Sequence, residues 1–459
     1  MPTRGPALPP SRIYGESTQL PPSRSRLSAI RLQRLCRTFW WSWGMSDWAE
    51  SSLEQLVTFQ KGRKVDTSSF AQDGFAPYLG ASGIEGGDDG YAATQFAVMS
   101  KPTDILMLWD GERSGLVGYG KTGVVASTVS KLSPNDAINP KYLFFALSDR
   151  FAWIQHRRTG TGVPHVPKDL GRILRLRYPS DPRLQIKIAS IFEATDTLIQ
   201  KSEALIAKYQ QIKAGMMHDL FTRGVLPNGQ LRPPRSEAPE LYQDTSIGWI
   251  PSMWKLKRCA DICTRICVGI VIQPTQYYVE SGVPAFRSAN IREDGIDPSN
   301  LVFISHASNE VVAKSQVKAG DILSVRTGYP GTSAVVPVHF DRANCIDILI
   351  STPSAQVISE YLCDWINSPF GKEQVLRQQG GMAQQHFNVG EMRELLVALP
   401  SREEQGDIRN RIGVVAKKLA AEKALLEKLQ YQKLGLMHDL LTGKVSVRVD
   451  NPASELANA

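Results

Sequence analysis

The stretch GLVGYGKT, residues 115–122, has the letters and the spacing of a phosphate-binding loop. In such a loop, a strand brings glycines to the N-terminus of a helix, whose free N–H groups hold the phosphates. After Gly123, the residues VVASTVS are mostly β-branched or small and predict a strand instead of that helix. We therefore interpret the stretch as a glycine-rich turn that exposes Lys121.

The segment CADICTRIC contains Cys259, Cys263 and Cys267, which would share one face of a helix. A zinc site needs four ligands, commonly from paired short spacings, and the sequence contains no second cluster. Thiols that pack as small core residues explain the pattern better, so we expect no metal. His218 and His438 each precede Asp near an expected helix end, which is typical of helix-terminus residues. The sequence also lacks HExxH and N-P-P-[YF], and we expect this chain not to be an enzyme.

The segments around these two histidines are nearly the same. GMMHDLFTRGV occupies residues 215–225, and GLMHDLLTGKV occupies residues 435–445. When residues 198–225 are aligned without gaps to residues 418–445, 12 of the 28 positions are identical. Upstream, PTDILMLWDG in the first half matches AGDILSVRTG in the second, in the same order. The chain is therefore an internal repeat of roughly 200 residues per unit, far longer than the ~20–50-residue periods of solenoids.

Each copy of the repeat ends in an expected long helix. Residues 183–221 contain no Pro and one Gly, and Asp181-Pro182 supplies a helix start signal. Apolar residues recur three and four positions apart in both copies, although Glu422 and Lys433 interrupt the second. Such a stripe needs a partner helix, and the other copy is the economical one. We predict an antiparallel coiled coil of helices about 50 Å long. The predicted helix–helix contacts are Ile191, Leu198, Leu205, Tyr209, Ile212, Met216, Val415, Leu419, Leu426, Leu429 and Leu436.

Short β-branched and aromatic runs, broken by Gly, Asp and Asn turns, fill the segments before the helices and predict compact domains. The expected fold class is α/β (α+β), with two globular domains, two long helices and a pseudo-two-fold internal repeat. The expected parts are an N-terminal extension (1–45), a first domain (46–180), a first long helix (181–224), a Pro-rich linker (225–247), a second domain (248–400), a second long helix (401–445) and a C-terminal tail (446–459).

The net charge of +8 is concentrated at the N-terminus. Residues 1–44 carry seven Arg and one Glu, a net +6, so the remaining residues carry only +2. Any nucleic-acid footprint must therefore come from local patches. We interpret residues 1–45 as disordered or as the product of an upstream start codon chosen in error, since Met45 opens a natural start; a basic arm or presequence is the alternative. No apolar run approaches the ~18–20 residues that span a bilayer, so we expect no membrane contact.

Two such domains, each followed by a long helix ending in L-[LF]-T-x-x-V, resemble the specificity subunit of a type I restriction–modification system. The resemblance is carried by PSREEQGDI (400–408), LLEKLQYQKLGLMHDLLTGKV (425–445) and their first-half counterparts. WDGERSG (109–115) is also similar to a stretch common in the first target-recognition domain. The first copy departs from the family at LQIKI (184–188), where E-Q-x-x-I is usual.

The resemblance implies a non-catalytic subunit that recognises a bipartite DNA target. Each globular domain would be a target-recognition domain reading one half of the double-stranded DNA sequence, and the helices would fix the separation. A pair of modification subunits would bring S-adenosylmethionine and adenine methylation. Restriction subunits would bring ATP- and magnesium-dependent translocation and cleavage. This chain itself would bind no cofactor, and it would work in the cytoplasm of a bacterium or archaeon.

DNA-contacting residues are chosen by physical logic, because base readout favours Arg, Lys, Asn and Gln in exposed loops. Some of them would touch phosphate, which positions the protein without specifying sequence. A coiled-coil scaffold without a DNA role and a stand-alone nuclease remain the alternative interpretations. The candidates are Arg113, Lys121, Arg157, Arg158, Thr161 and His165 in the first domain, and Arg287, Asn290, Arg292, Arg326, Gln378, Gln384 and Gln385 in the second.

Overall fold

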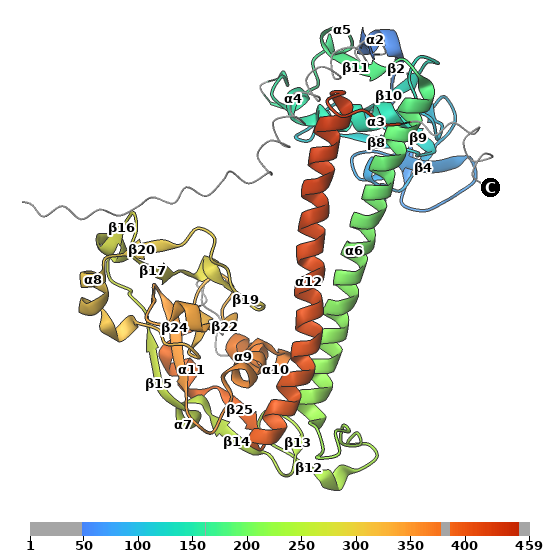
Figure 1. Cartoon of the computed structure of the whole chain (residues 1–459). Helices are drawn as coiled ribbons and strands as arrows, with labels where there is room; N and C mark the ends of the chain where they lie inside the picture. The colour runs from blue at the N-terminus through green and yellow to red at the C-terminus, as the bar shows by residue number, and fades with distance from the viewer. Residues whose placement is uncertain (1–47, 161, 378–385, 449–459) are drawn as a thin grey trace, which may run out of the picture. The chain divides into compact units, whose positions relative to one another are not determined.

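The computed structural model describes residues 48–160, 162–377 and 386–448 (Figure 1). The chain divides into two compact units, one running to Glu193 and resuming at Leu434, the other being Ala194–Lys433. The two longest helices, α6 (Pro182–Arg223) and α12 (Arg402–Leu441), each begin in one unit and end in the other. Each unit therefore combines an α/β domain with parts of both helices. The predicted N-terminal extension lies outside the described residues.

The first domain, residues 48–179, is built on two sheets. One is antiparallel with strand order β2-β10-β7-β8; the other has the order β3-β5-β4-β9-β6, in which β4 and β9 are parallel. β1 pairs with β11, the strand that leads into α6. The elements are β1 (Trp48–Ser52), α2 (Leu53–Leu56), β2 (Val57–Lys61), β3 (Thr67–Ser68), β4 (Phe75–Leu79), η1 (Gly83–Glu85), β5 (Tyr91–Ala93), β6 (Met99–Ser100), β7 (Ile105–Leu108), β8 (Val117–Tyr119), β9 (Gly123–Val125), β10 (Val129–Pro134), α3 (Pro140–Asp149), α4 (Phe151–Gln155), α5 (Leu170–Ile173) and β11 (Arg175–Pro179).

The second domain, residues 255–399, repeats this plan. Its sheets have the orders β15-β24-β21-β22 and β16-β20-β17-β23, with β17 and β23 parallel, and β14 pairs with β25. The elements, with those of the preceding linker, are η2 (Pro239–Leu241), β12 (Tyr242–Gln243), β13 (Ile250–Pro251), β14 (Lys255–Arg258), α7 (Cys259–Ile262), β15 (Cys263–Val268), η3 (Pro274–Tyr277), β16 (Tyr278–Val279), β17 (Val283–Phe286), η4 (Ser288–Asn290), β18 (Ile291–Arg292), β19 (Gly295–Ile296), β20 (Val302–Ile304), α8 (His306–Val311), η5 (Ala313–Ser315), β21 (Ile322–Val325), β22 (Ser333–Val335), η6 (Val338–Phe340), β23 (Asn344–Cys345), β24 (Ile348–Pro353), α9 (Ser359–Asn367), α10 (Pro369–Arg377), α11 (Val389–Glu394) and β25 (Leu396–Leu399).

The repeat extends to individual hydrogen bonds. In each domain, an aspartate just before a central strand accepts a backbone N–H from three residues earlier and a hydroxyl from the neighbouring strand. Because both aspartates are buried, these bonds are needed to keep the carboxylates satisfied. The bonds are Lys101 N–H to Asp104 (2.8 Å) and Ser133 Oγ to Asp104 (2.6 Å), and Lys318 N–H to Asp321 (2.8 Å) and Thr352 Oγ1 to Asp321 (2.6 Å).

A buried glutamine near the start of each long helix ties that helix to its own domain. Gln185 and Gln405 are both fully buried. The amide oxygen of each accepts a backbone N–H from the residue just before a short helix of the domain. These donors are Asn139 before α3, at 2.6 Å, and Ile358 before α9, at 2.8 Å. The amide nitrogen donates to the carbonyl of the preceding proline, at 2.8 Å and 3.1 Å respectively. The glutamine is thus the motif residue that the first copy keeps despite its departure from E-Q-x-x-I.

The C-terminal end of each long helix completes the core of the other copy's domain. In the first unit, Leu440 and Leu441 of α12 are buried in the same cluster as Phe192. In the second unit, Leu220 and Phe221 of α6 are buried against the core of the second domain. The repeated H-D-L-[LF]-T segments are therefore core-forming, and each is an amphipathic helix end that needs a domain to cover it.

Within the second unit, α6 and α12 run antiparallel, side by side. Ser202 donates to Glu422 at 2.6 Å, and Lys433 forms an ion pair with Asp196 at 2.5 Å. Residues 202 and 422 are equivalent in the two copies, so their direct contact marks the local two-fold axis of the helix pair. The two polar residues that interrupt the predicted apolar stripe therefore each face a polar partner on the opposite helix.

The predicted packing contacts fall into two groups. Leu419 is buried and most of the others are half-buried, but Leu198 and Ile212 are about half exposed. For these two residues the helix-pair contact stays a prediction, because a 3-4 stripe wider than one seam leaves its edges partly in solvent. Half-buried members are Ile191, Leu205, Tyr209, Met216, Val415, Leu426, Leu429 and Leu436.

The cysteine segment is not one helix. Cys259 opens the four-residue helix α7, whereas Cys263 and Cys267 lie in β15. This segment forms a strand instead of a helix because it pairs with β24, which lies far along the chain. The spacing of the cysteines cannot reveal such a long-range contact. No group of metal-ligating side chains occurs among the described residues. None of the described helices is long and apolar enough to cross a membrane.

Candidate nucleic-acid interface

Both domains carry the same hairpin loop, between β7 and β8 in the first and between β21 and β22 in the second. Gly111 and Gly328 have φ of 111° and 86° in these loops, a conformation that favours glycine. The last residue of the strand before each loop, Leu108 or Val325, exchanges backbone hydrogen bonds with residues at the far end of the loop. These bonds are Gly115 N–H to Leu108 (2.7 Å) and Leu108 N–H to Leu116 (2.8 Å), and Gly331 N–H to Val325 (3.0 Å) and Val325 N–H to Thr332 (2.8 Å).

A second segment lies beside each hairpin loop. Val166 N–H donates to the Trp109 carbonyl at 2.9 Å, and Phe387 N–H donates to the Arg326 carbonyl at 2.9 Å. The loops at 109–115 and 157–165 therefore form one surface in the first domain. In the second domain, much of the corresponding segment lies outside the described residues, and so do the candidates Gln378, Gln384 and Gln385.

Asp110 links the two loops of the first domain. It accepts Lys61 Nζ at 2.9 Å and faces His165 Nδ1 at 2.7 Å. Since the His165 side chain is still 46% exposed, it can face a ligand while Asp110 holds its ring. This arrangement orients one donor of the ring toward the carboxylate and leaves the other nitrogen at the surface.

The predicted arginines of the first domain differ in how firmly they are held. Arg113 pairs with Glu85 at 2.7 Å, and its side chain is 51% exposed. Arg157 lies over the Trp153 ring, 3.9 Å from its centroid, and is exposed. Arg158 instead donates to the carbonyls of Glu112 and Gln155, which fixes the loop end to α4. Arg158 therefore has a positioning role in this structure.

Lys121 lies in the turn between β8 and β9, which is a strand–turn–strand arrangement with no helix after the glycines. Its carbonyl accepts the Ser100 hydroxyl at 2.9 Å. The phosphate-loop letters therefore have the structural context expected of a turn. Thr161 lies outside the described residues.

In the second domain, two of the predicted DNA-contacting residues, Asn290 and Arg326, are engaged in hydrogen bonds within the chain. Asn290 is 1% exposed; its amide donates to the carbonyls of Asp297 and Ser299 and accepts the Arg287 N–H. A DNA contact was the wrong expectation for Asn290, because sequence shows residue type but not burial. Arg326 pairs with Asp347 and with the Phe387 carbonyl, and its side chain is 19% exposed.

The side chains of Arg287 and Arg292 are more accessible to a ligand than that of Asn290. Arg287 donates to the Asn300 carbonyl at 2.7 Å and is half-buried. Arg292 is exposed, with Asp297 3.9 Å away. Hydrogen bonds from Ser299 lower the pKa of Asp297, and Arg292 lowers it further, so this carboxylate stays charged beside the arginine.

Tyr329 was missed by the sequence analysis. It lies in the β21–β22 loop and is 83% exposed, next to a cavity of about 500 Å³ lined by Ile291, Val325 and Thr327 among others. Its signal in the sequence is an aromatic residue inside a glycine- and proline-rich turn, TGYPG, where burial is not available.

Comparison with known proteins points to one family. Residues 45–212 match the model of the type I restriction modification DNA specificity domain. The chain is similar to the MjaVIII specificity subunit of Methanocaldococcus jannaschii, with 24% identity over 420 residues, 88% of this chain and 94% of that protein. These matches indicate a specificity subunit of a type I restriction–modification system.

Two further likenesses agree with this assignment. The EcoBI specificity subunit of Escherichia coli is 22% identical over 380 residues, 80% of this chain and 78% of that protein. The crystal structure of the type I S subunit from M. genitalium has the same fold, with a TM-score of 0.58 at 15% identity, over 87% of this chain and 97% of that one. As a specificity subunit, the chain is a non-catalytic component that carries the sequence specificity of its complex.

Proposed function

We propose that this specificity subunit reads a bipartite DNA target, one half with each α/β domain, and directs methylation and cleavage by its partner subunits. The observation that carries the proposal is the repetition of a whole unit. The sheet, the hairpin loop with its glycine and the buried glutamine of the long helix all recur with matching backbone bonds. Two equivalent surfaces on one chain suit two half-sites.

The DNA contacts that we propose are the candidates that remain available at the loops. Arg113, Arg157 and His165 in the first domain keep partly or fully exposed side chains on neighbouring loops. Lys121, Thr161, Arg287, Arg292, Gln378, Gln384 and Gln385 remain candidates, with Tyr329 added. Arg158 and Arg326 are proposed to position the loops, because their donors are already engaged.

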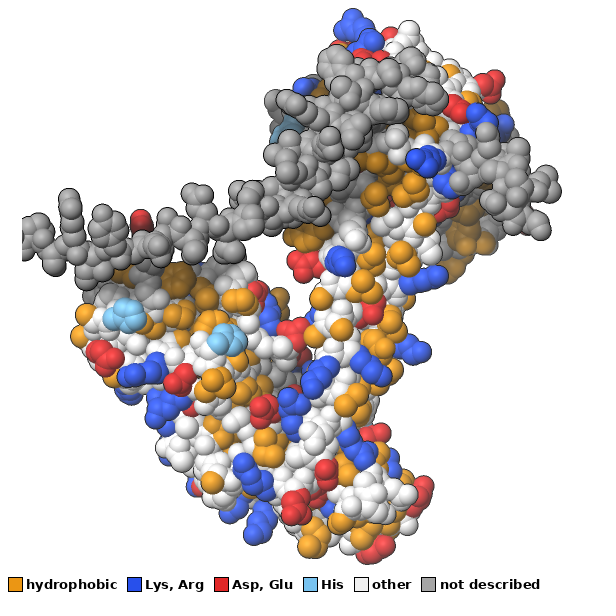
Figure 2. Space-filling model, in the orientation of Figure 1, with side chains coloured by type: hydrophobic (Ala, Val, Ile, Leu, Met, Phe, Trp, Pro, Cys, Tyr) orange, Lys and Arg blue, Asp and Glu red, His pale blue; other side chains and the backbone are white. Residues whose placement is uncertain are grey.

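We propose a pair of modification subunits as partners, docked on the helix pair. Apolar side chains that the described part of the chain leaves exposed lie along both helices. Figure 2 shows orange side chains on the face of the helix pair that it presents. Exposed apolar surface of this kind marks protein–protein contacts. Those partners would supply S-adenosylmethionine, and restriction subunits would supply ATP and magnesium, in the cytoplasm of a bacterium or archaeon. The exposed residues are Leu198 and Ile212 on α6, and Val414, Leu425, Tyr431 and Leu434 on α12.

The deciding experiment combines the purified chain with its modification partner, S-adenosylmethionine and a library of random DNA. We expect methylation at one sequence made of two defined halves and an undefined spacer. Methylation without sequence preference would favour a scaffold that has no DNA role. Cleavage of the DNA by this chain alone would favour a stand-alone nuclease. Either result contradicts the proposal.

A further inference from the structure

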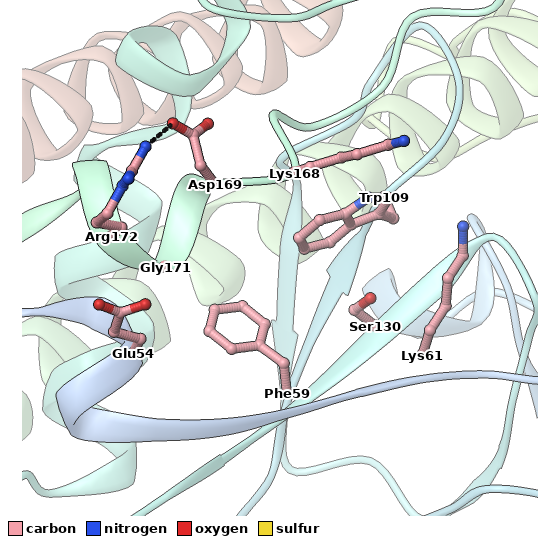
Figure 3. A pocket seen from close by; sticks show the side chains of 9 residues that line it. All are labelled: Glu54, Phe59, Lys61, Trp109, Ser130, Lys168, Asp169, Gly171 and Arg172. Carbon is pink, nitrogen blue, oxygen red and sulfur yellow. Dashed lines mark hydrogen bonds and ion pairs between the residues drawn. The ribbon is translucent and has the colours of Figure 1, made fainter.

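A cavity of about 370 Å³ opens in the first domain beside the interface loops (Figure 3). Phe59 of β2 and Trp109 both line it, and their rings meet edge to face with centroids 6.1 Å apart. Figure 3 shows the ammonium groups of Lys61 and Lys168 on one side of these rings and the Glu54 carboxylate on the other. The cavity therefore combines an aromatic wall with two lysines at one end and, at the other, the Glu54 carboxylate beside the Arg172–Asp169 ion pair.

The charges at the rim are only partly neutralised within the chain. Lys61 is bound to Asp110, and Arg172 to Asp169 at 3.2 Å. Lys168 and Glu54 are both exposed, and neither has an ion-pair partner in the part of the chain that the structure describes. Lys168 and Glu54 are thus available for a ligand that offers an anion and a hydrogen-bond donor.

The fold itself does not require these aromatic residues. In the first domain Phe59 pairs with Leu132 across β2 and β10; in the second, Ile266 occupies the corresponding place opposite Ser351. Trp109 corresponds to Arg326, since the same backbone bond is made at both positions. The second domain thus builds the same sheet with an aliphatic residue and an arginine. Among the described residues, aromatic rings therefore occupy these two corresponding positions in the first domain and not in the second.

The chemistry of the cavity fits a nucleotide. An aromatic side chain offers a stacking face to any base, and a nearby lysine neutralises a phosphate. The volume is at the small end of the ~300–1,000 Å³ range of ligand pockets, so it suits one nucleotide rather than a larger ligand. Trp109 begins the hairpin loop, and Asp110 joins it to Lys61 and His165. A base displaced from DNA bound at these loops would be within reach of the cavity.

We propose that this cavity holds one unstacked thymine of the DNA target, the thymine opposite the adenine that the partner methylates. This inference rests on the proposed function. Enzymes that modify a base take it out of the helical stack, so its pairing partner is left without a pair. Trp109 and Phe59 receive the thymine ring, Glu54 accepts its N3–H, and Lys168 binds the adjoining phosphate. The first domain thereby stabilises the opened base pair in its own half-site.

The test uses the full chain assembled with its modification partner on a duplex that carries its target. The thymine opposite the methylated adenine is replaced by 5-iodouracil, which forms a covalent photoproduct with an aromatic ring that it contacts. Mass spectrometry of the digested complex then locates the crosslink. We expect it at Trp109 or Phe59. A second arm irradiates the complex with free 5-iodo-dUMP in place of the substituted duplex.

Two results would overturn the inference. One is a duplex that is methylated normally but gives no crosslink at either aromatic residue; the proposed function would then stand and the cavity assignment would fall. The other is an equal crosslink with free 5-iodo-dUMP, which would make the cavity a site for free nucleotides. Loss of sequence-specific methylation by the unmodified complex, in contrast, would refute the proposed function itself, together with the inference that depends on it.

Variants supply an independent measurement. Lys168→Ala removes one phosphate contact and is expected to weaken specific DNA binding by about tenfold, with a smaller loss at higher salt. Lys168→Arg should restore most of the affinity. Lys101→Ala, an exposed lysine of the same domain away from the cavity, is the matched control and should bind like the unmodified chain. Equal affinity for Lys168→Ala and Lys101→Ala would contradict the proposed phosphate contact.

Discussion

Glu404 and Leu184 occupy the same place in the two copies but have opposite character. Glu404 is 9% exposed and accepts the Val225 N–H at 2.8 Å, the Trp254 indole N–H at 3.1 Å and both terminal nitrogens of Arg232. It therefore fastens the chain that leaves α6 to the start of α12. Glu404 thus has an anchoring role in the second copy that Leu184 cannot have in the first.

Replacing Glu404 by leucine, the residue of the first copy, should unfold the second domain more easily. Arg232 would stay buried without its partner, which costs roughly 3–5 kcal/mol. Denaturant unfolding of the chain measures this. Adding Arg232→Met should recover only part of the loss, because the Trp254 and Val225 N–H groups would still lack an acceptor. Full recovery in the double variant would show that these two bonds contribute little.

Asp364 of α9 makes stability depend on pH. Burial raises its pKa to about 6, against the opposing attraction of Lys213 and Arg409. Below about pH 4 the carboxyl is protonated in both the folded and the unfolded chain. As the pH rises from there to about 6, it ionises first in the unfolded chain, so the free energy of unfolding falls. Above about pH 6 the carboxyl is ionised in both states and this loss of stability stays constant. Asp364→Asn should remove this fall, worth roughly 3 kcal/mol at most. Urea unfolding from pH 4 to 7 measures it, with exposed Asp407→Asn as the control; parallel curves for both variants would contradict it.

At the scale of elements, the ends of the long helices are parts of the domain cores. Phe221 of α6 is 1% exposed and meets Tyr361 and Trp365 edge to face, with centroids 5.6 Å and 5.2 Å away. Phe221→Ala should therefore destabilise the second domain by ~3–5 kcal/mol. Thermal unfolding followed by limited proteolysis assigns the effect to a domain.

The control for this prediction is the equivalent position in the other helix. Leu441→Ala removes a residue buried in the first domain's core and should destabilise the first domain instead. If both variants exposed the same domain to protease, the assignment of each helix end to the opposite copy's domain would be wrong.

The sequence predicted the long helices well because their signals are local. The absence of proline from 183–221 and the recurring apolar positions indicate a helix without reference to the rest of the chain, and α6 spans Pro182–Arg223. The cysteine segment was mispredicted because β15 exists only through its pairing with β24, some 85 residues later in the chain. The internal repeat also helped to predict the long helices, because the same helix-end segment occurs at residues 215–225 and 435–445.

Side-chain roles at the candidate interface were harder to predict. Arg113, Arg157 and Arg326 are all arginines in loops, yet Arg326 is held by Asp347, a residue that the sequence does not place near it. Asn290 looks like a base reader by type but is a buried connector of its own loop. Conversely, Trp109 gave no local sign of lining a cavity, because Phe59 and Lys168 reach it only through the tertiary fold.

At the scale of the whole molecule, the two domains should be exchangeable. Each contains its own sheets and is tied by a buried glutamine to the long helix that follows it, so we expect its surface not to depend on the sequence of the other. We expect that replacing residues 248–400 with the second domain of another specificity subunit changes only one half of the methylated sequence. Sequencing of methylated DNA reports the target of the hybrid. A simultaneous change in both halves would mean that the domains do not read independently.

The helix pair should act as the ruler between the half-sites. Inserting four residues after Gln200 and four after Ala420 lengthens each helix by about one turn, roughly 6 Å. These positions are equivalent in the two copies and lie just before Ser202 and Glu422, so both helices change at their local two-fold axis. An insertion in one helix alone would shift its apolar stripe out of register with its partner.

B-DNA rises about 3.4 Å per base pair, so the preferred spacer should grow by one or two base pairs while both half-sites stay the same. The insertion also rotates one helix end relative to the other, because four residues exceed one 3.6-residue turn, and some loss of affinity is expected. Mapping methylated sites for the parent and the double insertion compares the two spacers directly. A variant that methylates well at the parental spacer would show that helix length does not set the separation, and the antiparallel helix pair would then need another reason to be present in two copies.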